Sequence, residues 1–206
     1  MSEYDPLIPR AEHSLSDDLE RVQRRFAVAR RPYLSSPIPW LVWAILLPGA
    51  ALATPRAVAG FGPVGVLVLW SVTVLVGGVV EGSAIFQRRT TGATPLAAWV
   101  LRLQGNQSLI AVVLSAFLVW KGLAGALPGV WLLLVGHSFF LLGGLAFRPM
   151  RQVGVIYQIG GVLELWPGPT ALWIFAIATA AGNLRLAIAL LRERREGRSS
   201  GRDANG

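Results

Sequence analysis

The sequence contains no cysteine and only two histidines among its 206 residues. Without thiols the chain has no disulfide framework, no cysteine nucleophile and no thiolate metal site. The apolar middle of the chain holds only His137, so two histidines cannot be paired there to bind a metal. We therefore expect neither a metal nor another cofactor.

Charge is also scarce, because charged residues make up 15% of the chain, against about 25% in an ordinary globular domain. Hydrophobic residues reach 53%, more than one soluble domain of this length can bury in its core. Most charges lie in residues 1–36 and 192–206, and the residues between them hold eight basic and two acidic groups. This distribution is typical of a polytopic membrane protein.

Proline positions mark the expected membrane helices. About 20 apolar residues cross the ~30 Å hydrocarbon layer, and proline fits the first helical turn better than a helix interior. Pro48 lies inside the first expected helix, where we predict a kink. The sequence predicts an all-α bundle of six transmembrane helices, over about 38–54, 62–86, 96–120, 128–147, 150–166 and 169–191.

The basic residues predict the orientation of this domain, residues 37–191. With six spans and both termini in the cytoplasm, 17 of the 19 Lys and Arg residues lie inside, and only Arg56 and Lys121 lie outside. This asymmetry follows the positive-inside rule and favours six spans over five. The net charge of +8 is therefore interpreted as an orientation signal of a multi-pass cell (plasma or inner) membrane protein.

The two tails differ in character. In the cytoplasmic tail 1–36, residues 14–31 predict an amphipathic helix with one apolar stripe. This helix either lies on anionic lipid of the inner leaflet or packs on the protein's own cytoplasmic loops. The tail 192–206 is basic and expected to be disordered. Neither tail has a recognition motif for nucleic acid, which we exclude as a partner. The candidate lipid-facing residues are Arg21, Arg24, Arg25, Arg30 and Arg31.

Polar residues within the expected helices are candidate functional groups, because they are costly in a bilayer. Glu81 and Arg102 are predicted near the cytoplasmic ends of adjacent helices, as a structural ion pair or as a gate or proton site. Glu164 is expected near the outer interface, within reach of water.

A polar run follows Arg102 in the third expected helix. Gln104, Asn106 and Gln107 occupy one helical turn, so some must face the bundle or a wet vestibule. His137, near the middle of the fourth expected helix, is either a neutral side chain bonded to a neighbour or a proton-responsive site.

No hydrolase, metalloprotease or phosphate-loop motif is present, and the two carboxylates of the apolar region are expected too far apart for acid–base catalysis. We therefore do not expect an enzyme. The first functional hypothesis is a regulatory, scaffolding or stress-associated membrane protein that acts through a protein partner, a second copy or lipid. The alternative is a small-solute, ion or proton transporter or channel, lined by polar residues of the second, third and fourth helices. Convergence of these residues on a cavity would favour the alternative.

A weak repeat accompanies this pattern. Three of the expected helices begin behind a proline and carry a tryptophan a few residues later. The pairs are Pro63 with Trp70, Pro128 with Trp131, and Pro169 with Trp173. The repeat suggests three successive helical hairpins.

Overall fold

A computed structural model describes residues 17–18, 20–21, 36–86, 95–165 and 170–203. These residues form helices and no strand, which confirms the all-α prediction for this part of the chain. The elements are α2 (Ile38–Phe86), α3 (Pro95–Trp120), the short 3-10 helix η2 (Ala124–Ala126), α4 (Leu127–Ala146), α5 (Arg148–Leu165) and α6 (Ala171–Asp203). Three stretches are long and apolar enough to cross a membrane: Ile38–Ala84, Ala124–Gly144 and Ala171–Arg195.

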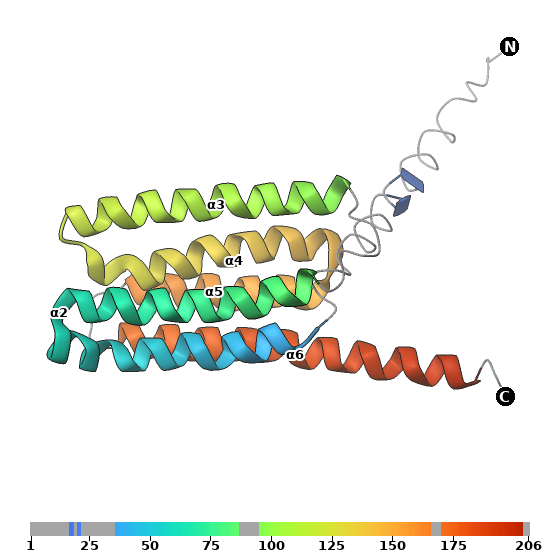
Figure 1. The fold of residues 1–206 in the computed structure, drawn as a ribbon. Coiled ribbons are helices and arrows are strands. Elements are labelled where there is room, and N and C mark those ends of the chain that lie inside the picture. The colour runs from blue at the N-terminus through green and yellow to red at the C-terminus, as the bar shows by residue number, and fades with distance from the viewer. Residues whose placement is uncertain (1–16, 19, 22–35, 87–94, 166–169, 204–206) are drawn as a thin grey trace, which may run out of the picture.

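Helix α2 is folded back on itself as a hairpin (Figure 1). Gly62 has φ 60° and ψ −151°, a conformation that only glycine adopts without strain. The Nε1 of Trp70 donates to Thr54 Oγ1, and that of Trp43 donates to Glu81 Oε2, each over 3.1 Å. Both pairs are symmetric about Gly62, since their members lie eight and nineteen residues from it. The two halves of α2 therefore run antiparallel.

The reversal at Gly62 corrects the predicted shape of the first helix. Pro48 and Pro55 both lie inside α2, whereas the non-helical dihedral angles of this element are at Gly62. The expected end at residue 54 is therefore wrong, and the helix passes through Pro55. Proline is tolerated in membrane helices where neighbouring groups satisfy the freed carbonyl.

The pair α3 and α4 repeats a motif of the α2 hairpin. In α2, Thr54 Oγ1 donates to Ala50 O over 2.8 Å while it accepts the Trp70 indole. In α3, Ser115 Oγ donates to Ala111 O over 2.7 Å and accepts the Trp131 indole over 2.9 Å. We call these two chains, Trp70–Thr54–Ala50 and Trp131–Ser115–Ala111, the indole clasps.

The turns and the third expected hairpin show how far this repeat extends. Gly122, which like Gly62 has a positive φ, lies in the turn between α3 and α4. In the third hairpin Trp173 is 58% exposed and no such clasp is formed among the described residues. The repeat is therefore a property of the first two hairpins.

Helices α4 and α5 are held together by glycines. A Cβ atom placed on Gly136 would lie 2.9 Å from Gly154 O, and one on Gly129 would lie 2.9 Å from Gly161 O. Such distances leave no room for a side chain, so the two backbones are in direct contact. We call this set, Gly129, Gly136, Gly143, Gly154 and Gly161, the glycine seam.

The core lies among α2, α4, α5 and α6. Phe139 of α4 stacks on Tyr157 of α5 with 5.7 Å between ring centroids, and Trp40 of α2 meets Phe139 edge-on at 5.8 Å. Among the described side chains of helix α3, the partly buried Leu103 is the one that packs on this cluster. It lies at the edge of the bundle, packed chiefly on α4 (Figure 1).

The C-terminal part of α6 corrects a prediction. The segment 192–203, expected to be disordered, continues the helix to Asp203 and projects beyond the other helices (Figure 1). Arginine and glutamate are good helix formers, and extending an existing helix needs no new nucleation. Residues 204–206 lie outside the described part.

Little of the predicted N-terminal helix is described. Within 14–31, Asp17, Asp18, Glu20 and Arg21 are helical and exposed, and Arg21 Nη1 lies 3.6 Å from Asp18 Oδ1. The other predicted lipid-facing arginines, Arg24, Arg25, Arg30 and Arg31, lie outside the described residues.

Candidate functional site

Glu81 has a partner that the sequence did not predict. Its carboxylate is partly buried and accepts the bond from Trp43 in the other half of α2. Arg102 is exposed on α3, and no ion pair joins it to Glu81 in the described structure. The predicted pair is not formed because α3 packs on α4 rather than on the second half of α2. The symmetry of Trp43 and Glu81 about Gly62 is the sequence signal that could have identified this contact.

The polar run of α3 divides between two faces. Gln107 is partly buried, and its Nε2 donates to the Leu134 carbonyl of α4. Asn106 is exposed and makes no hydrogen bond among the described residues. Gln104 belongs to α3, but its side chain lies outside the described part. One amide of the run thus links two helices, while another faces outward.

His137 is exposed on α4, next to the buried Ser138. Within the described residues its side chain has no hydrogen-bond partner. Since Gln107 contacts Leu134, the antiparallel pairing of α3 and α4 puts His137 at about the level of Asn106 along the bundle. Of the described side chains of this predicted cluster, Arg102, Asn106 and His137 are exposed, whereas Glu81 and Gln107 are partly buried in contacts between helices.

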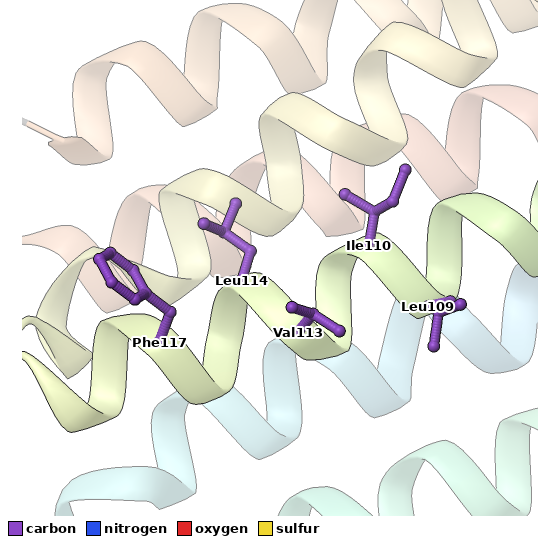
Figure 2. A pocket seen from close by; sticks show the side chains of 5 residues that line it. All are labelled: Leu109, Ile110, Val113, Leu114 and Phe117. Carbon is purple, nitrogen blue, oxygen red and sulfur yellow. The ribbon is translucent and has the colours of Figure 1, made fainter.

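An open groove runs along α3, lined by Leu109, Ile110, Val113, Leu114 and Phe117 (Figure 2). Figure 2 shows Ile110, Leu114 and Phe117 directed toward α4, one turn apart. Every lining side chain is apolar, and none belongs to the predicted polar cluster. The groove suits a hydrocarbon surface rather than a polar solute.

Two buried polar groups lie outside the predicted cluster. Glu164 of α5 is 3% exposed, and neither of its carboxylate oxygens has a hydrogen-bond partner in the described structure. The Tyr157 hydroxyl, two turns away on α5, is also buried without a described partner. The expectation that Glu164 reaches water is wrong, because its side chain is buried. A Cβ on Gly129 of α4 would lie only 3.3 Å from the Glu164 Cβ. The close packing of α4 and α5 at the glycine seam thus places the Glu164 side chain next to α4.

Other polar side chains tie helices together or are satisfied within one helix. Arg185 of α6 donates to Gln152 Oε1 of α5 from Nε and Nη2, over 3.2 and 2.8 Å. Asn183 Nδ2 donates to the Thr179 carbonyl within α6 over 2.9 Å. The described side chains form no group of three or more His, Cys, Asp or Glu residues that could hold a metal ion. These bonds are suited to fixing helix positions.

The long apolar helices indicate a membrane protein. Comparison with known protein families, with curated proteins and with solved structures finds no match for this chain.

Proposed function

We propose that this chain is a non-enzymatic multi-pass protein of the cell membrane that acts by binding a partner within the bilayer. It crosses the membrane six times, through the two halves of α2 and through α3, α4, α5 and α6. The observation that carries this proposal is the use of polar side chains for contacts between helices, as in Trp43–Glu81 and Gln107–Leu134. A transport path would instead need them to line a common cavity, and the described groove is wholly apolar.

The proposed orientation has both termini in the cytoplasm. The turns at Gly62 and Gly122 then face outward, and the 17 basic residues counted above lie on the inner side. The N-terminal arginines, of which Arg21 is exposed, would then lie close to anionic lipid of the inner leaflet.

Single cysteines in this cysteine-free chain test the orientation. We expect Lys121→Cys to react with a membrane-impermeant maleimide on intact cells, and Arg148→Cys to react only after permeabilisation. The unsubstituted protein, which has no thiol, is the control. Labelling of Arg148→Cys on intact cells would overturn the proposed topology.

Reconstitution tests the proposed absence of transport. Vesicles that contain the purified protein should pass protons and monovalent ions no faster than protein-free vesicles of the same lipid. A flux that rises with the amount of protein and is lost in the Glu81→Gln or His137→Leu variant would contradict the proposal and favour the transporter alternative.

A further inference from the structure

Helix α3 carries a continuous exposed stripe at the edge of the bundle. Its members recur at alternating intervals of four and three residues and are all exposed: Arg102, Asn106, Leu109, Val113, Ala116 and Trp120. This is the spacing of a seam between two coiled helices. Leu109 is 62% and Val113 61% exposed, so the seam has no partner within the described chain.

Asn106 distinguishes this stripe from an ordinary lipid-facing surface. It is the twelfth of the 26 residues of α3, so at about 1.5 Å per residue it lies roughly 17 Å from one helix end and 21 Å from the other. This depth is within the hydrocarbon layer when α3 spans the membrane. Lipid offers no hydrogen bond to an amide, and an unsatisfied polar group there is costly. Unlike Asn183, which bonds to its own helix, Asn106 makes no bond in the described structure.

The chemistry of the Asn106 amide suits a second copy of the chain as its partner. An asparagine side chain both donates and accepts, so two copies related by a twofold axis can satisfy each other. The two α3 helices can approach each other closely here, because the adjacent Gly105 has no side chain and open space beside it: an added Cβ would meet no atom within 4 Å. One turn further along, Leu109 and Val113 are apolar members of the same stripe and also line the groove (Figure 2).

We propose that α3 forms a parallel homodimer with α3 of a second copy, with Asn106 bonded to its twin and Leu109 and Val113 packed beyond it. Of the proposed function, this interface depends on one part alone, which is that α3 spans the membrane. Arg102 lies one turn closer to the proposed cytoplasmic end. There its guanidinium snorkels to the headgroups, so the paired helices diverge at that end.

Cysteine crosslinking tests this geometry, since a twofold axis brings the same residue of two copies together. In membranes under mild oxidation, Val113→Cys should give a disulfide-linked dimer of twice the monomer mass. Val79→Cys is the matched control, because Val79 is also 61% exposed but lies on α2. Equal crosslinking of the two variants, or none at Val113→Cys, would overturn the proposal.

The amide is tested separately through the dimer dissociation constant, measured by energy transfer between labelled copies in liposomes. Asn106→Leu should raise it about five- to thirty-fold, the equivalent of one membrane amide bond. Asn106→Gln should retain most of the affinity, and Ser71→Leu, a polar-to-apolar change at an exposed position of α2, should have no effect.

Each remaining outcome has a defined meaning. An unchanged dissociation constant in Asn106→Leu, with the helical circular dichroism intact, would overturn the role of the amide. A crosslinked product whose mass differs from twice the monomer would identify another protein as the occupant and overturn the homodimer. If maleimide labelling contradicts the topology while the dimer persists, the proposed function fails and the α3 interface stands.

Discussion

Glycine has two separate physical roles in this chain. At Gly136 it provides space, because any side chain would collide with Gly154 O and the Tyr157 Cβ, both 2.9 Å from an added Cβ. At Gly62 it provides a backbone conformation, since an added Cβ there would meet nothing within 4 Å. Gly144 has neither role in the described structure, because it lies in α4 with open space beside it. Substitution by a larger residue is therefore expected to be costly at Gly62 and Gly136 and tolerated at Gly144.

Gly136→Ala should destabilise the protein because α4 and α5 must separate to admit a methyl group. The expected loss is about 1–3 kcal/mol in the free energy of unfolding, the usual cost of overpacking. The measurement is reversible unfolding in mixed micelles, followed by circular dichroism. Gly144→Ala on the same helix is the matched control and should raise stability by about 0.5–1 kcal/mol, because alanine is favoured in a helix and its methyl group meets nothing there. Equal effects of the two substitutions would contradict the glycine seam.

The indole clasps make a second prediction about single residues. Trp131→Phe and Ser115→Ala each remove one partner of a bond that joins α3 to α4. A double-mutant cycle between them should give a coupling of about 0.6 kcal/mol, as measured for membrane hydrogen bonds. Trp173→Phe combined with Ser115→Ala should show no coupling, since no described bond joins these residues. A coupling near zero for the first pair would show that the clasp adds no stability.

Among the elements, α2 depends most on one backbone position. Its halves pair through contacts placed symmetrically about Gly62, so the reversal and the pairing are set together. A continuous α-helix of 49 residues would be about 74 Å long, more than twice the hydrocarbon thickness. The positive φ at Gly62 is what converts one overlong segment into two antiparallel helices.

Gly62→Ala should therefore weaken the hairpin, because alanine in this conformation costs about 1–3 kcal/mol. The expected result is a lower midpoint of thermal unfolding in detergent. Gly60→Ala is the control: the added methyl meets nothing within 4 Å, and alanine in a helix is favoured over glycine by about 0.5–1 kcal/mol. The two substitutions, only two residues apart, should shift the midpoint in opposite directions.

The limits of sequence-based prediction are also clearest for the elements. The positions of proline and of charged residues predicted the ends of α3, α4 and α5 to within two residues. Both signals are local, because they depend on the residues at the helix ends and not on which helices are neighbours. The Glu81–Arg102 pair was wrong because sequence can suggest the depth of a residue but not which helices touch. The burial of Glu164 depends on the backbone contact at Gly129, which requires knowing that α4 and α5 are neighbours.

At the scale of the whole molecule, the four elements that share the core differ from α3. Helices α2, α4, α5 and α6 supply most of the core cluster, while α3 is joined to α4 mainly through Gln107, Ser115 and their partners. Local stability follows the density of such contacts. Helix α3 is thus expected to be the first to separate from a monomer.

Hydrogen–deuterium exchange can measure this difference. In detergent, at a protein concentration low enough to keep the protein monomeric, amides of residues 105–120 should exchange sooner than those of residues 150–164. The latter segment contains Gly154 and Gly161 of the glycine seam. Raising the protein concentration should protect the α3 amides selectively when a second copy covers them. Equal exchange of both segments in the monomer would contradict the peripheral position of α3.

The clasps also bear on the order in which the chain is assembled during synthesis. Each clasp joins residues sixteen positions apart, so a hairpin can close as soon as its second helix leaves the ribosome. The main neighbour of α2 is α6, which is made last. During most of translation, α2 is therefore in the bilayer without α6. The bond between Trp70 and Thr54 holds its two halves together as a hairpin until α6 is made.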